Sequence, residues 1–218
     1  DGRNSQMRRW GGFEVQHEPD LLQISGVIFD NCTVPADAWS IILTPNIGVA
    51  FAPQGNGRAR AYVVTRKADG GPPLSGDAHL GDFLAACRTA HVPEEWLADA
   101  KPTGPLAQYN CADHWVPHPA RAGVALIGDA AAVSDPYMGC GTSLTLTDVH
   151  LLRDCLLATN DWQVAAEHYA AQHDEAYGAV HRLIAWQREL HWGTGPAADL
   201  RRARHAERAE AEPWREPD

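Results

Sequence analysis

Four runs of apolar residues in the first third of the chain have the length and spacing of β-strands. They cover residues 21–29, 39–43, 47–51 and 59–64. Between the last two runs, Gln54-Gly55-Asn56-Gly57 has the composition of a hairpin turn. Because closely spaced strands joined by short loops usually pair antiparallel, the pattern predicts an antiparallel sheet in this part of the chain.

Helical spacing of apolar residues appears after the predicted sheet. The pattern predicts a short helix over residues 78–89 and a return to strand over residues 105–116. A second helix is predicted to begin near Thr142. Helices and an antiparallel sheet in succession favour the α+β class.

The last quarter of the chain is predicted to be helical with one interruption. Apolar positions keep helical spacing up to Trp192, and Asn160 with Gln163 has the spacing of a capping box at the start of this long helix. Gly193-Thr194-Gly195-Pro196 is predicted to end it. Residues 197–218 are rich in Ala, Arg and Glu, which predicts one exposed helix.

The stretch from Gly123 to Asp148 joins a strand, a turn and a helix start. Residues 124–127 form a short apolar run, which predicts a strand buried on both faces, and the chain then turns at Asp135-Pro136. Gly139-Cys140-Gly141 precedes the helix, whose unpaired N–H groups and positive dipole end suit an anionic or carbonyl-rich ligand. The same glycine spacing also serves to pack a helix tightly on a strand, so spacing alone leaves both interpretations open.

Two motifs far apart in the chain resemble those of the flavin-dependent aromatic hydroxylases, the family of p-hydroxybenzoate hydroxylase. Gly128-Asp129-Ala130-Ala131, followed by Pro136, Gly139-x-Gly141 and Asp148, is similar to the GD motif of that family. The first eight residues, DGRNSQMR, are similar to its DG motif, D-G-x-x-S-x-x-R. The resemblance implies a class A flavoprotein monooxygenase with FAD as its cofactor.

The resemblance also implies which positions bind the cofactor. In the family the GD aspartate binds the ribityl chain of the flavin, which implies that role for Asp129. The helix start faces the pyrimidine edge of the isoalloxazine ring, where a reduced flavin carries negative charge that a helix N-terminus favours. The DG motif lies near the pyrophosphate. The expected cofactor-binding positions are Asp1, Gly2, Asp129, Pro136, Gly139, Cys140, Gly141, Thr142 and Ser143.

Four positions depart from the family pattern. Ala132 stands where a histidine is common, Asp135 replaces the first of a frequent proline pair, and Ser143 replaces a usual asparagine. Cys140 stands where glutamine is common, and it either modulates the flavin electronically or simply fills space. Asp135 is the one candidate catalytic residue, as an ionisable group near the flavin, although a residue before a proline also serves to shape a turn. These differences leave the substrate and the reaction open.

One expected motif is missing from the sequence. No GxGxxG follows a predicted strand, although in the resembled family this fingerprint binds the ADP half of FAD. The chain also begins at Asp1, inside a motif and without methionine. We therefore expect the C-terminal portion of such an enzyme, with the ADP-binding part supplied by a missing N-terminal segment or by a partner chain.

The expected fold class is α+β with α/β character. It combines part of a FAD-binding Rossmann-like domain with an antiparallel substrate-binding sheet and C-terminal helices. The expected domains are residues 1–16 for the DG-motif remnant of the FAD-binding domain, 17–119 for the substrate-binding sheet, 120–160 for the GD motif and its helix, and 161–218 for the C-terminal helices.

Composition and charge narrow the classes of partner. The 218 residues are 44% hydrophobic and 21% charged, which is typical of a globular protein. The formal net charge of -10 argues against binding to nucleic acid or to an anionic membrane. Five scattered cysteines without a CxxC pair favour reduced thiols, and neither a signal peptide nor a membrane-spanning run is evident, so a cytoplasmic location is expected.

Metal binding is not expected. His114 and His118 have the H-x-x-x-H spacing of a helical metal site, but Pro117 and Pro119 exclude a helix there. No third ligand is apparent in the sequence. The 11 histidines also include no nucleophile arrangement such as GxSxG.

The resemblance implies an FAD-dependent monooxygenase. NAD(P)H is the expected reductant, and O₂ is expected to oxygenate a small, aromatic substrate while the protein supplies position and exclusion of water. Two alternatives stay open. One is flavin-dependent dehydrogenation or reduction without oxygen insertion, and the other is a non-catalytic half that contributes the substrate sheet and the flavin-ring loop to a partner polypeptide.

Overall fold

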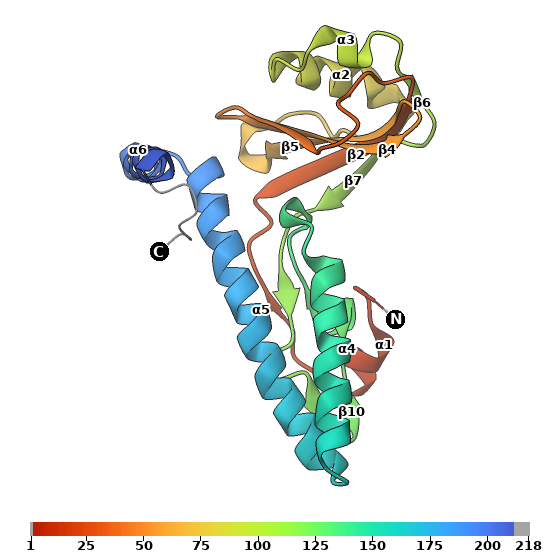
Figure 1. Ribbon diagram of the computed structural model, residues 1–218, viewed down its shortest axis with the longest axis vertical. Helices are drawn as coiled ribbons and strands as arrows, with labels where there is room; N and C mark the ends of the chain where they lie inside the picture. The colour runs from red at the N-terminus through yellow and green to blue at the C-terminus, as the bar shows by residue number, and fades with distance from the viewer. Residues whose placement is uncertain (1, 212–218) are drawn as a thin grey trace. The chain divides into compact units, whose positions relative to one another are not determined.

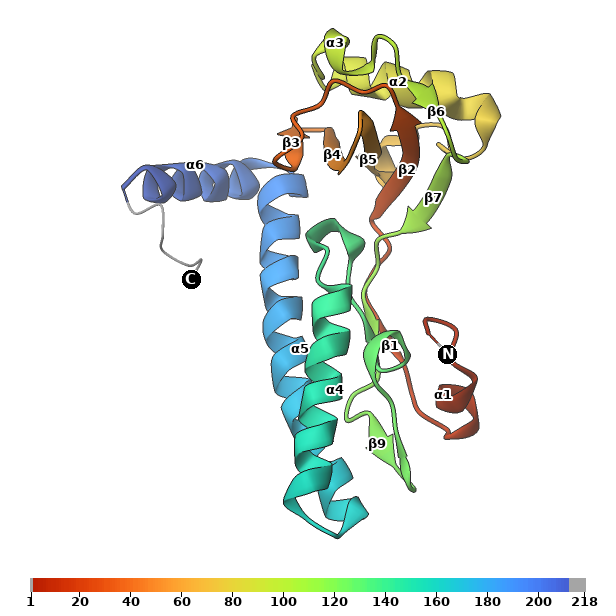
Figure 2. The same cartoon turned by 45° about the vertical axis from the view of Figure 1, so that its right-hand side comes forward.

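The computed structural model describes residues 2–211, and it combines helices with antiparallel sheets (Figures 1 and 2). This arrangement confirms the predicted α+β class. The chain divides into two compact units, each discontinuous in sequence. Unit 1 comprises Asp1–Gln23 and Tyr109–Ile184, and unit 2 comprises Ile24–Gln108 and Ala185–Asp218. The segment 17–119, expected to form the sheet domain, contributes residues to both units.

The larger sheet confirms the predicted antiparallel arrangement. Its strand order is β3-β4-β5-β2-β6, and β7 also pairs with β2. The pairs β3–β4, β4–β5 and β2–β6 are antiparallel. The strands are β2 (Leu22–Asp30), β3 (Ser40–Leu43), β4 (Ile47–Gly55), β5 (Arg58–Arg66), β6 (Lys101–Pro102) and β7 (Ala107–Asn110).

The backbone conformation of the turn between β4 and β5 explains why its sequence predicts a hairpin. Gly55, Asn56 and Gly57 have φ angles of 85°, 53° and 71°, all in the left-handed region. Glycine and asparagine adopt this backbone conformation more easily than other residues do. The three residues therefore set the register between β4 and β5.

One face of the sheet packs against two helices in unit 2. In β5, Ala59, Ala61 and Val63 alternate with more exposed residues, as expected for a strand with one buried face. The helices α2 (Leu80–Thr89) and α3 (Glu94–Leu97) cover this face, and Phe83 of α2 is fully buried in the same cluster. The helix predicted over residues 78–89 is therefore confirmed, after a 3₁₀ turn, η2 (Asp77–His79).

Unit 1 is built from short strands and the helices α4 (Gly141–Ala158) and α5 (Trp162–Trp192), of which α5 begins in this unit. Both views show α4 and the first part of α5 side by side (Figures 1 and 2). Cys155, Ala165 and Tyr169 form a buried cluster where these helices meet. The other elements are α1 (Gln6–Trp10), β1 (Gln16–His17), β8 (His114–Trp115), β9 (Ala120–Arg121), β10 (Val124–Ala125), η3 (Gly128–Ala130), β11 (Ala132–Val133) and η4 (Pro136–Met138).

Two predicted strands are shorter than expected. In place of a strand over residues 124–127, β10 spans two half-buried residues and pairs antiparallel with β9. Ile127 is extended, and Leu126 and Ile127 pack in different clusters. The apolar character of residues 124–127 therefore reflects burial in the core and not strand pairing along the whole run. The strand predicted over residues 105–116 is divided into β7 and β8.

The helical end of the chain follows the prediction, except at one cap. The long helix α5 ends at Trp192 as predicted, and α6 (Pro196–Ala211) follows the glycine-containing break. The remainder of the predicted tail helix, residues 212–218, lies outside the described residues. At the start of α5, Asp161 Oδ1 accepts hydrogen bonds from the N–H groups of Gln163 (2.9 Å) and Val164 (3.2 Å). The helix is therefore capped by Asp161, and the prediction of Asn160 as the cap is wrong by one position.

Candidate functional site

The turn after β10 is built around Gly128. Gly128–Ala130 form the single 3₁₀ turn η3, in which Gly128 has a φ of 56°. A Cβ at this position would lie 2.8 Å from Thr145 Oγ1 on α4. Glycine is therefore required both by the backbone and by the close approach of the turn to the helix. The turn leaves Asp129 exposed between two buried residues.

The start of α4 presents hydrogen-bond donors. Cys140 is the N-cap residue, and no side chain among the described residues caps the helix there. The N–H of Leu144 donates to Cys140 O (2.9 Å), which leaves the N–H groups of residues 141–143 without partners in the helix. These donors and the positive end of the dipole favour an anionic or carbonyl-bearing ligand. The helix predicted to begin near Thr142 is thus confirmed to within one residue.

The two glycines beside Cys140 open space at this helix start. Gly139 has a φ of 66°, which a residue with a side chain adopts only with strain. A Cβ at Gly139 or at Gly141 would meet no atom of the described residues within 4 Å. The glycines therefore do not pack the helix against a strand at these positions. Their backbone is open to the approach of a ligand.

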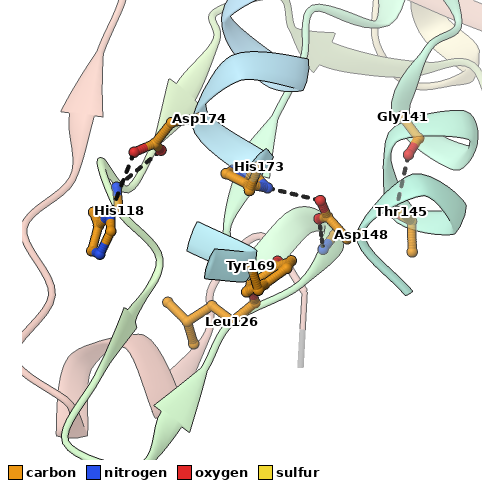
Figure 3. Close-up of polar contacts among 9 residues, drawn as sticks. His118, Leu126, Gly141, Thr145, Asp148, Tyr169, His173 and Asp174 are labelled. Carbon is orange, nitrogen blue, oxygen red and sulfur yellow. Dashed lines mark hydrogen bonds and ion pairs between the residues drawn. The ribbon is translucent and has the colours of Figure 1, made fainter. Parts of the chain in front are cut away.

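A buried polar network lies beneath the turn (Figure 3). Asp148 of α4 accepts a hydrogen bond from Gly128 N at Oδ2 (2.7 Å), and its Oδ1 lies 2.7 Å from His173 Nδ1 on α5. Both residues are almost fully buried. The Tyr169 hydroxyl donates to Leu126 O (2.5 Å) just before the turn. Burial, with repulsion from Asp148 and Asp174, raises the pKa of Tyr169, so this hydroxyl keeps its proton.

A second buried carboxylate contacts the segment that leads to η4. Asp113, which is fully buried, accepts a hydrogen bond from the backbone N–H of Asp135. The Asp135 side chain is itself 1% exposed. The candidate catalytic carboxyl is therefore withdrawn from the protein surface, unlike that of Asp129.

The DG and GD motifs contact each other directly. Ser5 caps α1 by accepting a hydrogen bond from Arg8 N (3.0 Å). Arg8 is almost buried, and its guanidinium donates to Ala130 O (3.4 Å) of the turn and to Arg3 O (2.6 Å). Burial, and then repulsion from the neighbouring Arg9, lowers the pKa of Arg8 below its ordinary value. Ser5 at the N-cap and Arg8 within this short helix thus connect the DG motif to the GD turn.

Two histidines near this corner differ in burial. His114 lies in β8, and burial, followed by the charges of Arg3 and Arg8, lowers its pKa to about 4. His118 is exposed, with Nε2 2.6 Å from Glu167 Oε2, and its backbone N–H donates to Asp174 Oδ1 (3.0 Å; Figure 3). Among residues 2–211 no group of three His, Cys, Asp or Glu side chains is arranged to hold a metal ion.

The structure brings the predicted positions of the GD motif to one corner and leaves the first DG residue undescribed. Asp1 lies outside the described residues, while Gly2 has a φ of 70° and accepts a hydrogen bond from Ser5 N (3.0 Å). Thr142 and Ser143 are exposed in the first turn of α4, and Pro136 is exposed in η4. Arg8 and Asp148 belong to the two motifs, but the sequence does not predict the contacts that they make. The supporting residues Asp113, Tyr169 and His173 are not among the predicted site residues.

None of the five cysteines forms a disulfide. Four are buried, and burial raises the pKa of Cys87 to about 12. Cys140, at the N-cap of α4, is only partly buried. Within residues 2–211, no helix has the length and apolar character needed to cross a bilayer.

Known structures share this fold at low sequence identity. The chain superposes on Klebsiella pneumoniae HpxO complexed with FAD and uric acid with a TM-score of 0.75 at 23% identity, covering 96% of this chain and 54% of that one. For the myxobacterial chondrochloren halogenase CndH the TM-score is 0.73 at 17% identity, with 96% and 53% covered. For tetracycline destructase Tet(51) it is 0.66 at 15%, with 97% and 58% covered. The chain therefore spans little more than half the length of these structures.

A comparison by sequence gives the family. A search of curated proteins finds no match. The family profile described as FAD binding domain matches residues 1–186, a span that contains both the DG and the GD motif. This match, together with the geometry of the GD turn and the α4 start, confirms the resemblance to the flavin-dependent hydroxylases. The chain belongs to the FAD binding domain family.

Proposed function

We propose that the chain forms the flavin-ring side of an FAD-dependent monooxygenase that uses NAD(P)H and O₂ to oxygenate a small, aromatic substrate. The observation that carries the proposal is the exposed carboxylate of Asp129 on the turn that approaches α4 at Thr145, one helical turn after the open helix start at Gly141. An acceptor for hydroxyl groups and a set of N–H donors are thereby presented from neighbouring parts of one unit.

The residues of this corner fit a flavin in charge and in shape. A carboxylate at Asp129 suits the hydroxyl groups of a ribityl chain, which are hydrogen-bond donors. The unpaired N–H groups of residues 141–143 suit the carbonyl oxygens of the pyrimidine edge. The open space at Gly139 and Gly141 allows a flat ring to approach the backbone.

The protein's own contribution to the reaction is position and electrostatics. FAD, when bound, supplies hydride acceptance and oxygen activation. The α4 dipole favours negative charge near its N-terminus, which stabilises the reduced form of a flavin placed there. Asp129 orients the ribityl chain, and the hydrogen bonds of Arg8 and Asp148 hold the turn that presents Asp129. The buried carboxyl of Asp135 lies on this segment but is not exposed to a ligand, so we assign no proton transfer to it.

We also propose that the ADP half of FAD is bound by a segment or partner chain beyond residues 1–218. The absence of a GxGxxG in these residues supports this part of the proposal. The additional length of the similar structures, of which this chain covers 53–58%, also supports it. FAD binding therefore has to be measured on the complete native polypeptide that contains this chain.

The test of the proposal is FAD binding with and without the Asp129 carboxylate. We expect the native polypeptide to retain FAD, and Asp129→Ala to weaken its binding about 10- to 100-fold, because hydrogen bonds to a charged group contribute about 1.5–3 kcal/mol each. Quenching of flavin fluorescence measures both dissociation constants. Asp154→Ala removes an exposed carboxylate elsewhere on α4 and serves as the matched control, with unchanged affinity expected.

Failure of the native polypeptide to hold FAD would overturn the flavoenzyme proposal. With FAD bound, NAD(P)H-driven O₂ uptake in the presence of phenolic compounds tests the reaction. Oxygenated product in proportion to O₂ consumed supports a monooxygenase, whereas peroxide alone or oxidised product without added oxygen supports the dehydrogenase alternative.

A further inference from the structure

The loop between Gly128 and Asp135 is held at both ends by buried carboxylates. Asp148 Oδ2 accepts the Gly128 N–H at 2.7 Å, and Asp113 Oδ1 accepts the Asp135 N–H. The two carboxylates come from different elements, one from α4 and the other from the segment before β8. Asp129, the expected ribityl contact, lies between these two anchored ends.

Each carboxylate is also paired with a histidine of α5. His173 Nδ1 lies 2.7 Å from Asp148 Oδ1, and His181 Nε2 lies 3.6 Å from Asp113 Oδ2. Tyr177 stacks between the two imidazoles, with ring centroids 6.0 Å from His173 and 5.7 Å from His181 and interplanar angles of 7° and 12°. One face of α5 therefore places two imidazoles against the two carboxylates that hold the loop.

The His173–Asp148 contact is the more completely buried of the two. Their side chains are 4% and 5% exposed, whereas His181 is 20% exposed and also lies 3.1 Å from Glu18. A buried carboxylate is costly unless its oxygens are hydrogen-bonded, and Asp148 uses one oxygen for Gly128 and the other for His173. The Nε2 atom of His173 has no hydrogen-bond partner among the described residues, so its polar contact with the site is through Nδ1.

We propose that His173 is a positioning residue for the flavin, which acts through Asp148 to fix the Gly128 turn and thereby the direction of the Asp129 carboxylate. The inference rests on the proposed flavin-binding function. An Nδ1–H that donates to Asp148 keeps the carboxylate in the orientation that accepts the Gly128 N–H. Without this donor, Asp148 is free to rotate, and the turn loses the bond that sets its backbone.

Two substitutions at His173 separate hydrogen bonding from packing. His173→Phe keeps a flat ring against Tyr177 and removes the donor, while His173→Asn loses the ring and places an amide N–H near the position of Nδ1. In the complete native polypeptide, we expect His173→Phe to weaken FAD binding about tenfold and His173→Asn to retain affinity within about threefold. His168→Phe, an identical change at an exposed position of α5, is expected to leave affinity unchanged.

The FAD dissociation constant and the thermal unfolding midpoint of the FAD-free protein are measured for each variant. Unchanged affinity in His173→Phe, or equal weakening in His173→Phe and His173→Asn, would overturn the inference, because packing rather than the donor would then be responsible. If His173→Phe does not fold, Asp148→Asn takes its place, with the same tenfold weakening expected and unchanged affinity as the contrary result. Absence of FAD from the unsubstituted polypeptide would instead refute the proposed function itself.

Discussion

Gly128 and Gly141 are glycines for different physical reasons. At Gly128 a side chain would collide with Thr145 of α4, and the backbone is left-handed. At Gly141 the surroundings are open and the backbone is not left-handed, so the protein alone does not require glycine there. A glycine that the fold does not require, at an uncapped helix start, is consistent with a requirement set by a ligand.

Gly141→Ala tests that distinction. Alanine at a helix position is more favourable than glycine, so the FAD-free protein should gain about 0.5 kcal/mol of unfolding free energy. The added methyl group should at the same time obstruct the flavin and weaken FAD binding about tenfold. Urea unfolding and flavin fluorescence measure the two effects. A variant that is stabilised and binds FAD normally would place the flavin elsewhere.

His114 predicts a specific dependence of stability on pH. Its pKa in the folded protein is lowered to about 4 by burial and by Arg3 and Arg8, below the ordinary 6.5. The unfolded chain therefore binds the proton more readily, so this histidine's contribution is complete above pH 6.5 and is lost as the pH falls towards 4. Between pH 7 and pH 5 the loss is about 2 kcal/mol. Urea titrations at both pH values measure it.

His114→Gln provides the control for this pH effect. A neutral side chain cannot be protonated, so the variant should lose about 2 kcal/mol less than the native protein between pH 7 and pH 5. An identical pH dependence in the two proteins would show that other groups are responsible.

At the scale of elements, the start of α5 gives a test of helix capping. Asp161 accepts hydrogen bonds from two N–H groups of the first turn, whereas Asn160 precedes the cap. Asp161→Ala should therefore lower the unfolding free energy by about 1 kcal/mol, and Asn160→Ala by less than about 0.5 kcal/mol. Urea unfolding followed by tryptophan fluorescence distinguishes them. A larger loss at Asn160 would mean that the helix begins one residue earlier.

Elements defined by local sequence are the ones that the sequence predicts well. The β4–β5 hairpin follows from Gly55, Asn56 and Gly57, and the start of α4 follows from the glycines beside Cys140. The cap of α5 is missed because two adjacent residues, Asn160 and Asp161, are both good capping residues. Local preference does not decide between them.

The features of the site that the sequence does not predict are hydrogen bonds between residues far apart in the chain. The GD aspartate and the helix start are recognised from residues close together in sequence. The supporting bonds are not, because His173 reaches Asp148 across 25 positions and Asp113 reaches Asp135 across 22. Helical periodicity places His173 on the buried face of α5, but the periodicity does not identify its partner.

At the scale of the whole molecule, the burial of the cysteines predicts one accessible thiol. Cys32, Cys87, Cys111 and Cys155 are buried, and Cys140 is partly exposed beside the proposed flavin. Among the five thiols of residues 1–218, that of Cys140 should react with a disulfide reagent at least about tenfold faster than the others. Substitution of Cys140 with serine should remove the fast phase, and FAD should slow it. A fast phase that persists in Cys140→Ser would assign it to another cysteine.

The contact between Arg8 and Ala130 also has a consequence for how the protein is made. These residues are 122 positions apart, so at about 5–20 residues per second the ribosome needs roughly 6–24 s to deliver the second after the first. The β4–β5 hairpin, whose partners are close in sequence, needs only microseconds to form once it has emerged. Arg8 therefore cannot make this contact until Ala130 has emerged, and the DG motif stays without its partner in the GD turn while the residues between them are synthesised.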